Sequence, residues 1–136
     1  MGLVISDEQY QRLLTFRTAL RRFDQWSREA AESHGLTQGQ HQLLLAIRGH
    51  AGSEGPTIGD VAEALLVKHH TATGLVDRAQ ETGLVERVRD ANDSRRVRLR
   101  LSSRGAEILT ALTAVHLEEI QRLAPLLDPV DRPISS

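Results

Sequence analysis

The sequence predicts a single, mainly α-helical domain over residues 1–136 that carries one small β-hairpin. Apolar residues recur every three or four positions through most of the chain, which is the spacing of amphipathic helices. Residues 85–89 and 97–101 instead interleave apolar and charged side chains over short stretches, as strands do. The length of 136 residues and an apolar content of 40% are sufficient for one packed core.

The composition excludes several classes of protein. There is no cysteine, so disulfide scaffolds, thiolate metal sites and cysteine catalysis are excluded. The longest uninterrupted apolar run covers residues 43–47, which is far too short to cross a membrane. The first residues lack the basic and apolar regions of a secretion signal, so we expect a cytoplasmic protein with no membrane partner.

The first predicted helix, residues 7–34, is long and amphipathic. It contains every aromatic residue of the chain: Tyr10, Phe16, Phe23 and Trp26. These side chains either form one side of the core of a single chain or pack against a second copy of it. The sequence supports both interpretations.

Capping signals place the next helices. Thr37 is followed three residues later by Gln40, and Thr57 by Asp60, which is the spacing of a capping box. A further helix is expected over about residues 68–82, because Gly83 occupies the position of a glycine C-cap. The helices that start near 57 and 68 are joined by a tight connection, so they form a candidate helix-turn-helix.

The two predicted strands flank residues 90–95, a run of turn-forming residues, and are therefore expected to form a hairpin. The apolar residues of 97–101 are expected to face the core, and the arginines at 96, 98 and 100 to face solvent. A hairpin, or wing, after two such helices predicts a winged helix-turn-helix. Residues 102–127 then form a second long helix, capped by Ser102, and the proline-containing residues 128–136 form an irregular tail.

Charge is distributed unevenly along the chain. The net charge is −1, yet residues 68–104 carry nine basic and five acidic side chains, a net +4. A basic module in an acidic chain is the pattern expected when one face of a protein meets a polyanion. A solvated arginine-rich surface gives the same pattern, so charge alone leaves both interpretations open.

Several motifs resemble those of the MarR (multiple antibiotic resistance regulator) family of winged helix-turn-helix transcription factors. They are Leu36-Thr37 with Gln40, residues 57–62, residues 71–78, residues 83–87, and the wing residues Asp90, Asp93, Arg95, Val97, Leu101, Ser102 and Gly105. The resemblance implies a DNA-binding lobe over residues 36–105, and long N- and C-terminal dimerisation helices over residues 7–34 and 102–127.

The resemblance also implies what the protein does. It implies a sequence-specific regulator that binds double-stranded DNA at a palindromic operator as a homodimer, without a cofactor. It further implies a ligand-responsive repressor, in which a small lipophilic or phenolic effector releases the DNA. Relatives place the effector pocket between the dimerisation helices and the DNA-binding lobe, which makes Phe23, Trp26 and His34 candidate lining residues. Each is equally consistent with core packing.

Groove chemistry and the resemblance together suggest the DNA contacts. A recognition helix reads base edges in the major groove with its N-terminal residues, and basic side chains hold phosphates. Arg95 matches the family arginine that enters the minor groove, and Asp93 is expected to orient it. The candidate DNA-binding residues are Lys68, His69, His70, Thr71, Thr73, Arg78, Arg95 and Arg96. Gly74 departs from the family pattern, because some relatives carry a DNA-contacting arginine there; a glycine permits a closer approach of the helix backbone to DNA.

The sequence gives less support to other functions. The chain contains no phosphate-binding loop, no Gly-x-Ser-x-Gly and no His-Glu-x-x-His motif, so we expect no enzyme activity. One alternative is a winged-helix module that binds another protein, which would gain if the arginines were paired with the chain's own acids. Another is a metal-sensing regulator with histidine and carboxylate ligands, since there are six histidines; no spacing is distinctive, and we assign no metal site.

Overall fold

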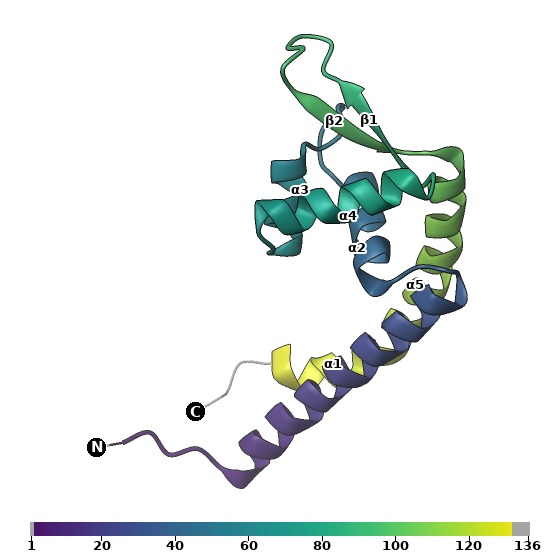
Figure 1. The fold of residues 1–136 in the computed structure, drawn as a ribbon. Coiled ribbons are helices and arrows are strands. Elements are labelled where there is room, and N and C mark those ends of the chain that lie inside the picture. Colours follow the sequence, from purple (N-terminus) through teal and green to yellow (C-terminus); the bar gives the residue numbers. More distant parts are fainter. Residues whose placement is uncertain (1, 132–136) are drawn as a thin grey trace.

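The computed structural model describes the backbone of residues 2–131 and the side chains of residues 2–125. Within this range the elements are, in order, α1 (Asp7–Ser33), α2 (Gln38–Arg48), α3 (Ile58–Leu65), α4 (His69–Glu81), β1 (Val85–Arg89), β2 (Val97–Leu101) and α5 (Ser103–Asp131). The predicted fold class, a mainly helical winged helix-turn-helix, is confirmed. Helices α2 to α4 and the hairpin form a lobe, from which α1 and α5 extend (Figure 1).

Local side-chain signals begin most of these helices. Capping boxes at Ser6, Thr37 and Thr57 begin α1, α2 and α3; the sequence predicted the second and third of them. Ser102 caps α5, because its Oγ accepts a hydrogen bond from the N–H of Gly105 at 3.0 Å. Lys68, which precedes α4, makes no capping hydrogen bond through its side chain. The first backbone N–H groups of α4 therefore receive no hydrogen bond from the side chain of Lys68.

The core of the lobe is formed by aliphatic side chains from every element of the lobe and from α5. Its largest fully buried members include Leu43, Leu44, Leu84, Leu99 and Leu112. Two glycines permit this close packing. A Cβ atom on Gly55 would collide with the carbonyl oxygen of Leu99, and one on Gly105 would collide with that of Leu84.

The wing is a short antiparallel ladder whose bounds match the prediction. Val85 lies opposite Leu101, and Arg89 lies opposite Val97 beside the wing loop. Leu99 faces the core as predicted, with 1% of its surface exposed, but the prediction is wrong for Val97, which is 36% exposed. The hairpin reaches beyond the helices towards its loop, so the end of the ladder that contains Val97 lacks their cover (Figure 1).

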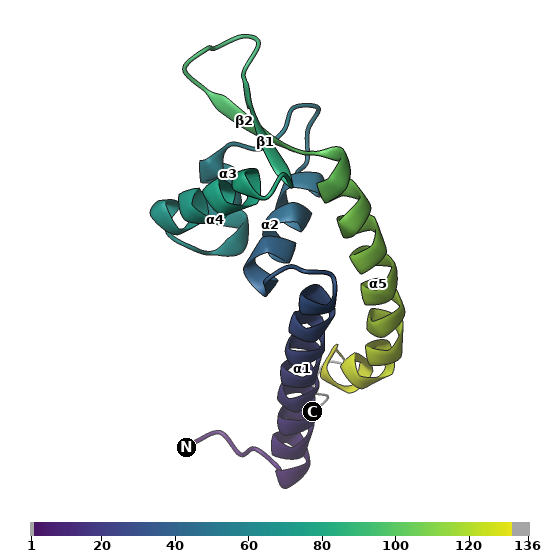
Figure 2. The ribbon, with the colours of Figure 1, turned by 45° about the vertical axis from the view of Figure 1, so that its right-hand side comes forward.

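Helix α5 is longer than predicted. The sequence predicted its end at residue 127 and an irregular tail over 128–136, whereas the helix continues to Asp131 and so includes Pro125 and Pro129. Residues 132–136 lie outside the described residues. Proline removes a helical hydrogen bond and kinks a helix without always ending it. Accordingly, the yellow end of α5 bends away from the axis of its first part (Figure 2).

In the part of the chain that the structure describes, no helix combines the length and apolar character needed to cross a bilayer.

Candidate nucleic-acid interface

Helix α4, the predicted recognition helix, separates its residues cleanly between two faces. Ala72, Val76 and Ala79 are buried against the lobe. The predicted contact residues Lys68, His69, His70, Thr71 and Arg78 are exposed. Thr73 is only partly exposed, and its hydroxyl donates a hydrogen bond to the carbonyl of His69 at 3.1 Å. The hydroxyl hydrogen of Thr73 is therefore already donated within the helix and is not available to an external acceptor.

The N-terminus of α4 is suited to an anion. The backbone N–H groups of its first turn point out of the helix end, where the helix dipole is positive. Ala72 is the first residue whose N–H bonds back, to the carbonyl of Lys68 at 3.1 Å. The Lys68 side chain adds a positive charge at the same end. This combination can hold a phosphate group.

An ion pair neutralises Asp77, one of the two carboxylates of α4; the other, Glu81, is exposed and forms no ion pair with any described residue. Arg87 on β1 reaches Asp77 at 2.6 Å and also donates to the amide oxygen of Gln80. The pair joins the wing to the recognition helix. It also neutralises a carboxylate that would otherwise repel an approaching anion. Sequence reasoning did not assign this role to Arg87, because the two residues lie ten positions apart on different elements.

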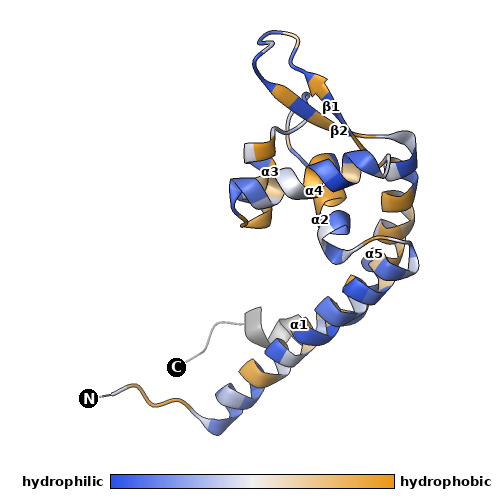
Figure 3. Cartoon of the chain, viewed as in Figure 1, coloured by the Kyte–Doolittle hydropathy of each residue, from blue (hydrophilic) through white to orange (hydrophobic). Residues whose placement is uncertain are grey.

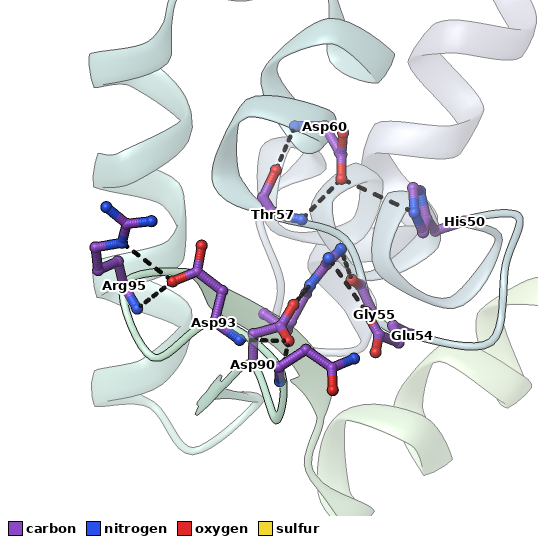
Figure 4. Close-up of polar contacts among 10 residues, drawn as sticks. His50, Glu54, Gly55, Thr57, Asp60, Asp90, Asp93 and Arg95 are labelled. Carbon is purple, nitrogen blue, oxygen red and sulfur yellow. Dashed lines mark hydrogen bonds and ion pairs between the residues drawn. The ribbon is translucent and has the colours of Figure 1, made fainter.

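The wing loop is held by a buried carboxylate (Figure 4). Asp90 Oδ1 accepts hydrogen bonds from the N–H groups of Asn92 at 2.7 Å and Asp93 at 3.3 Å, and its Oδ2 accepts from Arg98 Nε at 3.0 Å. These bonds, with that from Asn92 the strongest, hold the pKa of Asp90 below its usual value. Asp90 therefore remains charged and fixes the start of the loop.

Asp93 and Arg95 lie together at the tip of the wing (Figure 4). Asp93 Oδ1 accepts from the backbone N–H of Arg95 at 3.0 Å and from its Nε at 3.2 Å. The Arg95 side chain is 90% exposed, so the rest of its guanidinium is free to bind an external group. The geometry brings together the two residues that the sequence paired.

The other wing arginines differ in what they contact. Arg98 pairs with Asp90 and with Glu54, and it also donates to the carbonyl of Gly55 at 3.1 Å, so it fastens β2 to the loop between α2 and α3. Arg100 pairs with Glu86 at 2.8 Å on the neighbouring strand. The expectation that Arg98 faces solvent is therefore wrong. Among the described residues Arg96 makes no ion pair.

A second feature is a groove between the lobe and the extended helices. It has a volume of about 530 Å³, and its lining is mainly apolar, with Phe23 from α1, Leu45 from α2, and Leu117 and Ile120 from α5. Of the predicted effector-pocket residues, Phe23 lines this groove. His34 does not; its Nδ1 lies 3.0 Å from the carbonyl of Ala30 near the end of α1.

Trp26, the remaining predicted pocket residue, packs on a histidine cluster beside this groove. Its ring centroid lies 4.7 Å from that of His116, which in turn lies 4.6 Å from His41. His116 Nε2 lies 2.7 Å from the hydroxyl of Ser27. Burial, followed by the neighbouring His116 and then His34, lowers the pKa of His41. Sequence reasoning missed Ser27, His41 and His116 as groove residues, because three separate helices bring them together.

Over residues 2–125, whose side chains are described, no three histidine, aspartate or glutamate residues lie close enough together to hold a metal ion.

Comparison with known proteins connects this geometry to a family. The model of the MarR family matches residues 34–96, which span α2 to the wing loop. No curated protein sequence matches the chain at a significant level.

Solved structures share the fold over most of their length. A mutant of MepR from Staphylococcus aureus, bound to an oligodeoxyribonucleotide, is 27% identical with a TM-score of 0.68, over 85% of this chain and 82% of that one. MepR, a transcription regulator of the multidrug efflux pump MepA of that organism, is 25% identical with a TM-score of 0.71, over 81% and 79%. A MarR family protein from Bacillus stearothermophilus shares the fold at 24% identity and a TM-score of 0.74, over 88% and 82%. In its matched motifs and its fold, this chain is similar to the MarR family of winged helix-turn-helix transcription regulators.

Proposed function

We propose that this protein is a cytoplasmic, sequence-specific regulator that binds double-stranded DNA as a homodimer and acts by binding rather than by catalysis. One observation carries the proposal. The arginines at the base of the wing are used in internal ion pairs, whereas Lys68, Arg78 and Arg96 form no ion pair with any described residue. Free cations on the recognition helix and the wing are what a phosphate backbone requires.

The proposed contacts follow from the position of each group. Lys68, His69, His70 and Thr71 enter the major groove at the start of α4, where hydroxyl and basic groups read base edges. Arg95 enters the minor groove from the wing tip, held by Asp93. Arg78 and Arg96 bind phosphates. Thr73 contributes chiefly its methyl group, since its hydroxyl already donates to His69.

The homodimer is supported by apolar side chains that the single chain leaves exposed. Leu3, Val4, Leu13 and Leu14 are all more than half exposed at or near the start of α1. Leu117 on α5 is 57% exposed. Figure 3 shows apolar orange colour on the N-terminal segment and on α1. A second copy that covers these residues would also place two recognition helices for a palindromic site.

The groove supports a ligand-responsive repressor. A small lipophilic or phenolic molecule that entered between α1, α2 and α5 would alter how the lobe sits on the dimerisation helices. It would thereby change the spacing of the recognition helices, which must match successive turns of DNA. Ala46→Phe, which fills the groove, is expected to abolish such release while DNA binding is retained.

One alternative gains from the structure. The pairing of Arg87, Arg98 and Arg100 with internal acids reduces the effective charge of the wing, which favours a winged-helix module that binds another protein. The free cations at the start of α4 and at the wing tip favour DNA. The two functions differ in whether the chain selects a nucleotide sequence.

The test is selection from a library of randomised duplexes by the purified protein. We expect enrichment of a palindrome whose half-sites lie about 34 Å, or one helical turn, apart. We expect the selected duplex to bind roughly a thousandfold more tightly than a scrambled one, with affinity that falls steeply as salt rises. If no sequence is enriched, or if an enriched duplex binds no more tightly than a scrambled one, sequence-specific DNA recognition is excluded and the protein-binding alternative is favoured.

A further inference from the structure

Gly74 is a glycine that the fold does not need. It lies in the interior of α4, where every residue except proline forms helix more readily than glycine. Its backbone φ is not positive, so no left-handed conformation requires it. A Cβ atom built on Gly74 would meet no heavy atom within 4 Å. Gly55 and Gly105 differ, because a Cβ on either would collide with a carbonyl oxygen.

The position of Gly74 indicates that its missing side chain leaves room for a molecule that binds this face of α4. Gly74 is exposed and lies across the helix axis from the buried Ala72 and Val76. Its neighbours one turn away on the helix surface are His70 and Thr71 on one side, and on the other Arg78 and Asp77, whose charge is paired with Arg87. The missing side chain therefore leaves a gap at the centre of the face that we propose contacts DNA.

We propose that Gly74 is the point of closest approach between the recognition helix and the major groove, and that it selects a thymine there. This inference rests on the proposed function. Thymine is the base that presents a methyl group, at C5, in the major groove. Without a Cβ, the α4 backbone leaves room for that methyl group while the side chains at either end of the gap reach their own contacts. Gly74 is then a specificity-determining residue that acts by leaving room for the methyl group rather than by a hydrogen bond.

The inference predicts that stability and binding change in opposite directions. Gly74→Ala is expected to raise the Tm by roughly 2–6 °C, because alanine favours the helix and meets open space. The same methyl group would occupy the gap, so affinity for the duplex selected by the wild-type protein is expected to fall about tenfold. Gly59→Ala on α3 is the matched control, because Gly59 is also an exposed helical glycine and an added Cβ would meet only the Thr57 hydroxyl, at 3.7 Å. It is expected to leave affinity unchanged.

Modified duplexes identify the group that occupies the gap. Each thymine of the selected duplex is replaced in turn by deoxyuridine, which lacks only the methyl group, and both proteins are titrated by fluorescence anisotropy. On the thymine duplex, Gly74→Ala is expected to bind about tenfold more weakly than wild type. We expect one position in each half-site at which deoxyuridine makes this difference between the two proteins much smaller. Equal binding by a folded Gly74→Ala variant, or a loss that no deoxyuridine reduces, overturns the inference while DNA binding by the wild type stands. Failure of the wild type to select any duplex would instead contradict the proposed function itself.

Discussion

Asp93 Oδ1 accepts hydrogen bonds from both the backbone N–H and the side-chain Nε of Arg95, at 3.0 and 3.2 Å. The two bonds set the turn of the backbone and the direction of the guanidinium. Arg95 is otherwise exposed at the wing tip. An arginine that enters a minor groove gains from being held in place before it binds, since less rotational freedom is then lost on binding.

Asp93→Ala tests this relationship. We expect it to weaken binding to the selected duplex about fivefold, since it removes a charge-assisted hydrogen bond from an exposed loop. Thermal stability should change little. Asp93→Asn retains an oxygen acceptor at the same place and is expected to lose less. Anisotropy titrations measure both, and binding by Asp93→Ala as tight as that of the wild type would show that Arg95 needs no positioning.

A second prediction concerns the base of the wing. Arg98 is the charged partner of Asp90, whose side chain is only 4% exposed, and it also reaches Glu54 and Gly55. Arg98→Met keeps most of the apolar stem but leaves this carboxylate without its cation, so we expect the Tm to fall by roughly 5 °C or more. Arg100→Met breaks an exposed pair with Glu86 and is expected to cost much less. Equal losses in the two variants would refute a special role for Arg98.

A third prediction concerns pH. The folded state holds the pKa of His41 below its usual value of about 6.5, so the folded protein favours neutral His41 and the unfolded chain binds the proton more readily. The stability that neutral His41 contributes is complete above about pH 6.5 and is lost as the pH falls through and below that value.

Thermal melts between pH 7.5 and 5.5 measure this loss. His41→Phe keeps an aromatic ring but does not titrate, so its Tm should fall less over the same range. Asp60 and Asp90 have lowered pKa values, chiefly through backbone N–H groups of Thr57 and Asn92, and their contributions are lost only below about pH 4. A melting curve of His41→Phe as pH-sensitive as that of the wild type would place the effect elsewhere.

A fourth prediction concerns the second copy of the chain. Leu13 and Leu14 are each a little more than half exposed on α1, and burial of that remaining surface in a dimer stabilises it by roughly 1–2 kcal/mol per leucine. We expect the double substitution Leu13→Glu with Leu14→Glu to shift the protein from dimer to monomer in analytical ultracentrifugation. Gln11→Glu adds charge at an already polar exposed position and should leave the dimer intact. A wild type that sediments as a monomer at all concentrations would contradict the proposed homodimer.

Much of the fold could be predicted because its signals are local. The bounds of both strands, the capping boxes at Thr37 and Thr57 and the glycine C-cap at Gly83, whose φ is +76°, all depend on residues within a few positions of one another. The Asp93–Arg95 contact is of the same kind.

What the sequence could not predict depends on contacts between distant residues. The alternation of apolar and charged residues in 97–101 places Arg98 and Arg100 on the same face of the strand. Arg98 is covered only because the loop that carries Glu54 and Gly55 packs on it. The stacking of His41 on His116 requires the crossing of α2 and α5, which no periodicity reveals. The helical path through Pro129 was missed because proline predicts a break more often than a kink.

In the proposed function, the chain uses some of its arginines in internal ion pairs and presents others to DNA. The most direct test is the salt dependence of binding to the selected duplex for Arg96→Gln and Arg100→Gln. Each lost phosphate contact lowers the slope of log affinity against log salt by about one, so Arg96→Gln should lower it by about two per dimer. Arg100→Gln, which removes an internally paired arginine, should leave the slope unchanged. An unchanged slope for Arg96→Gln, or an equal loss in both variants, would contradict this division.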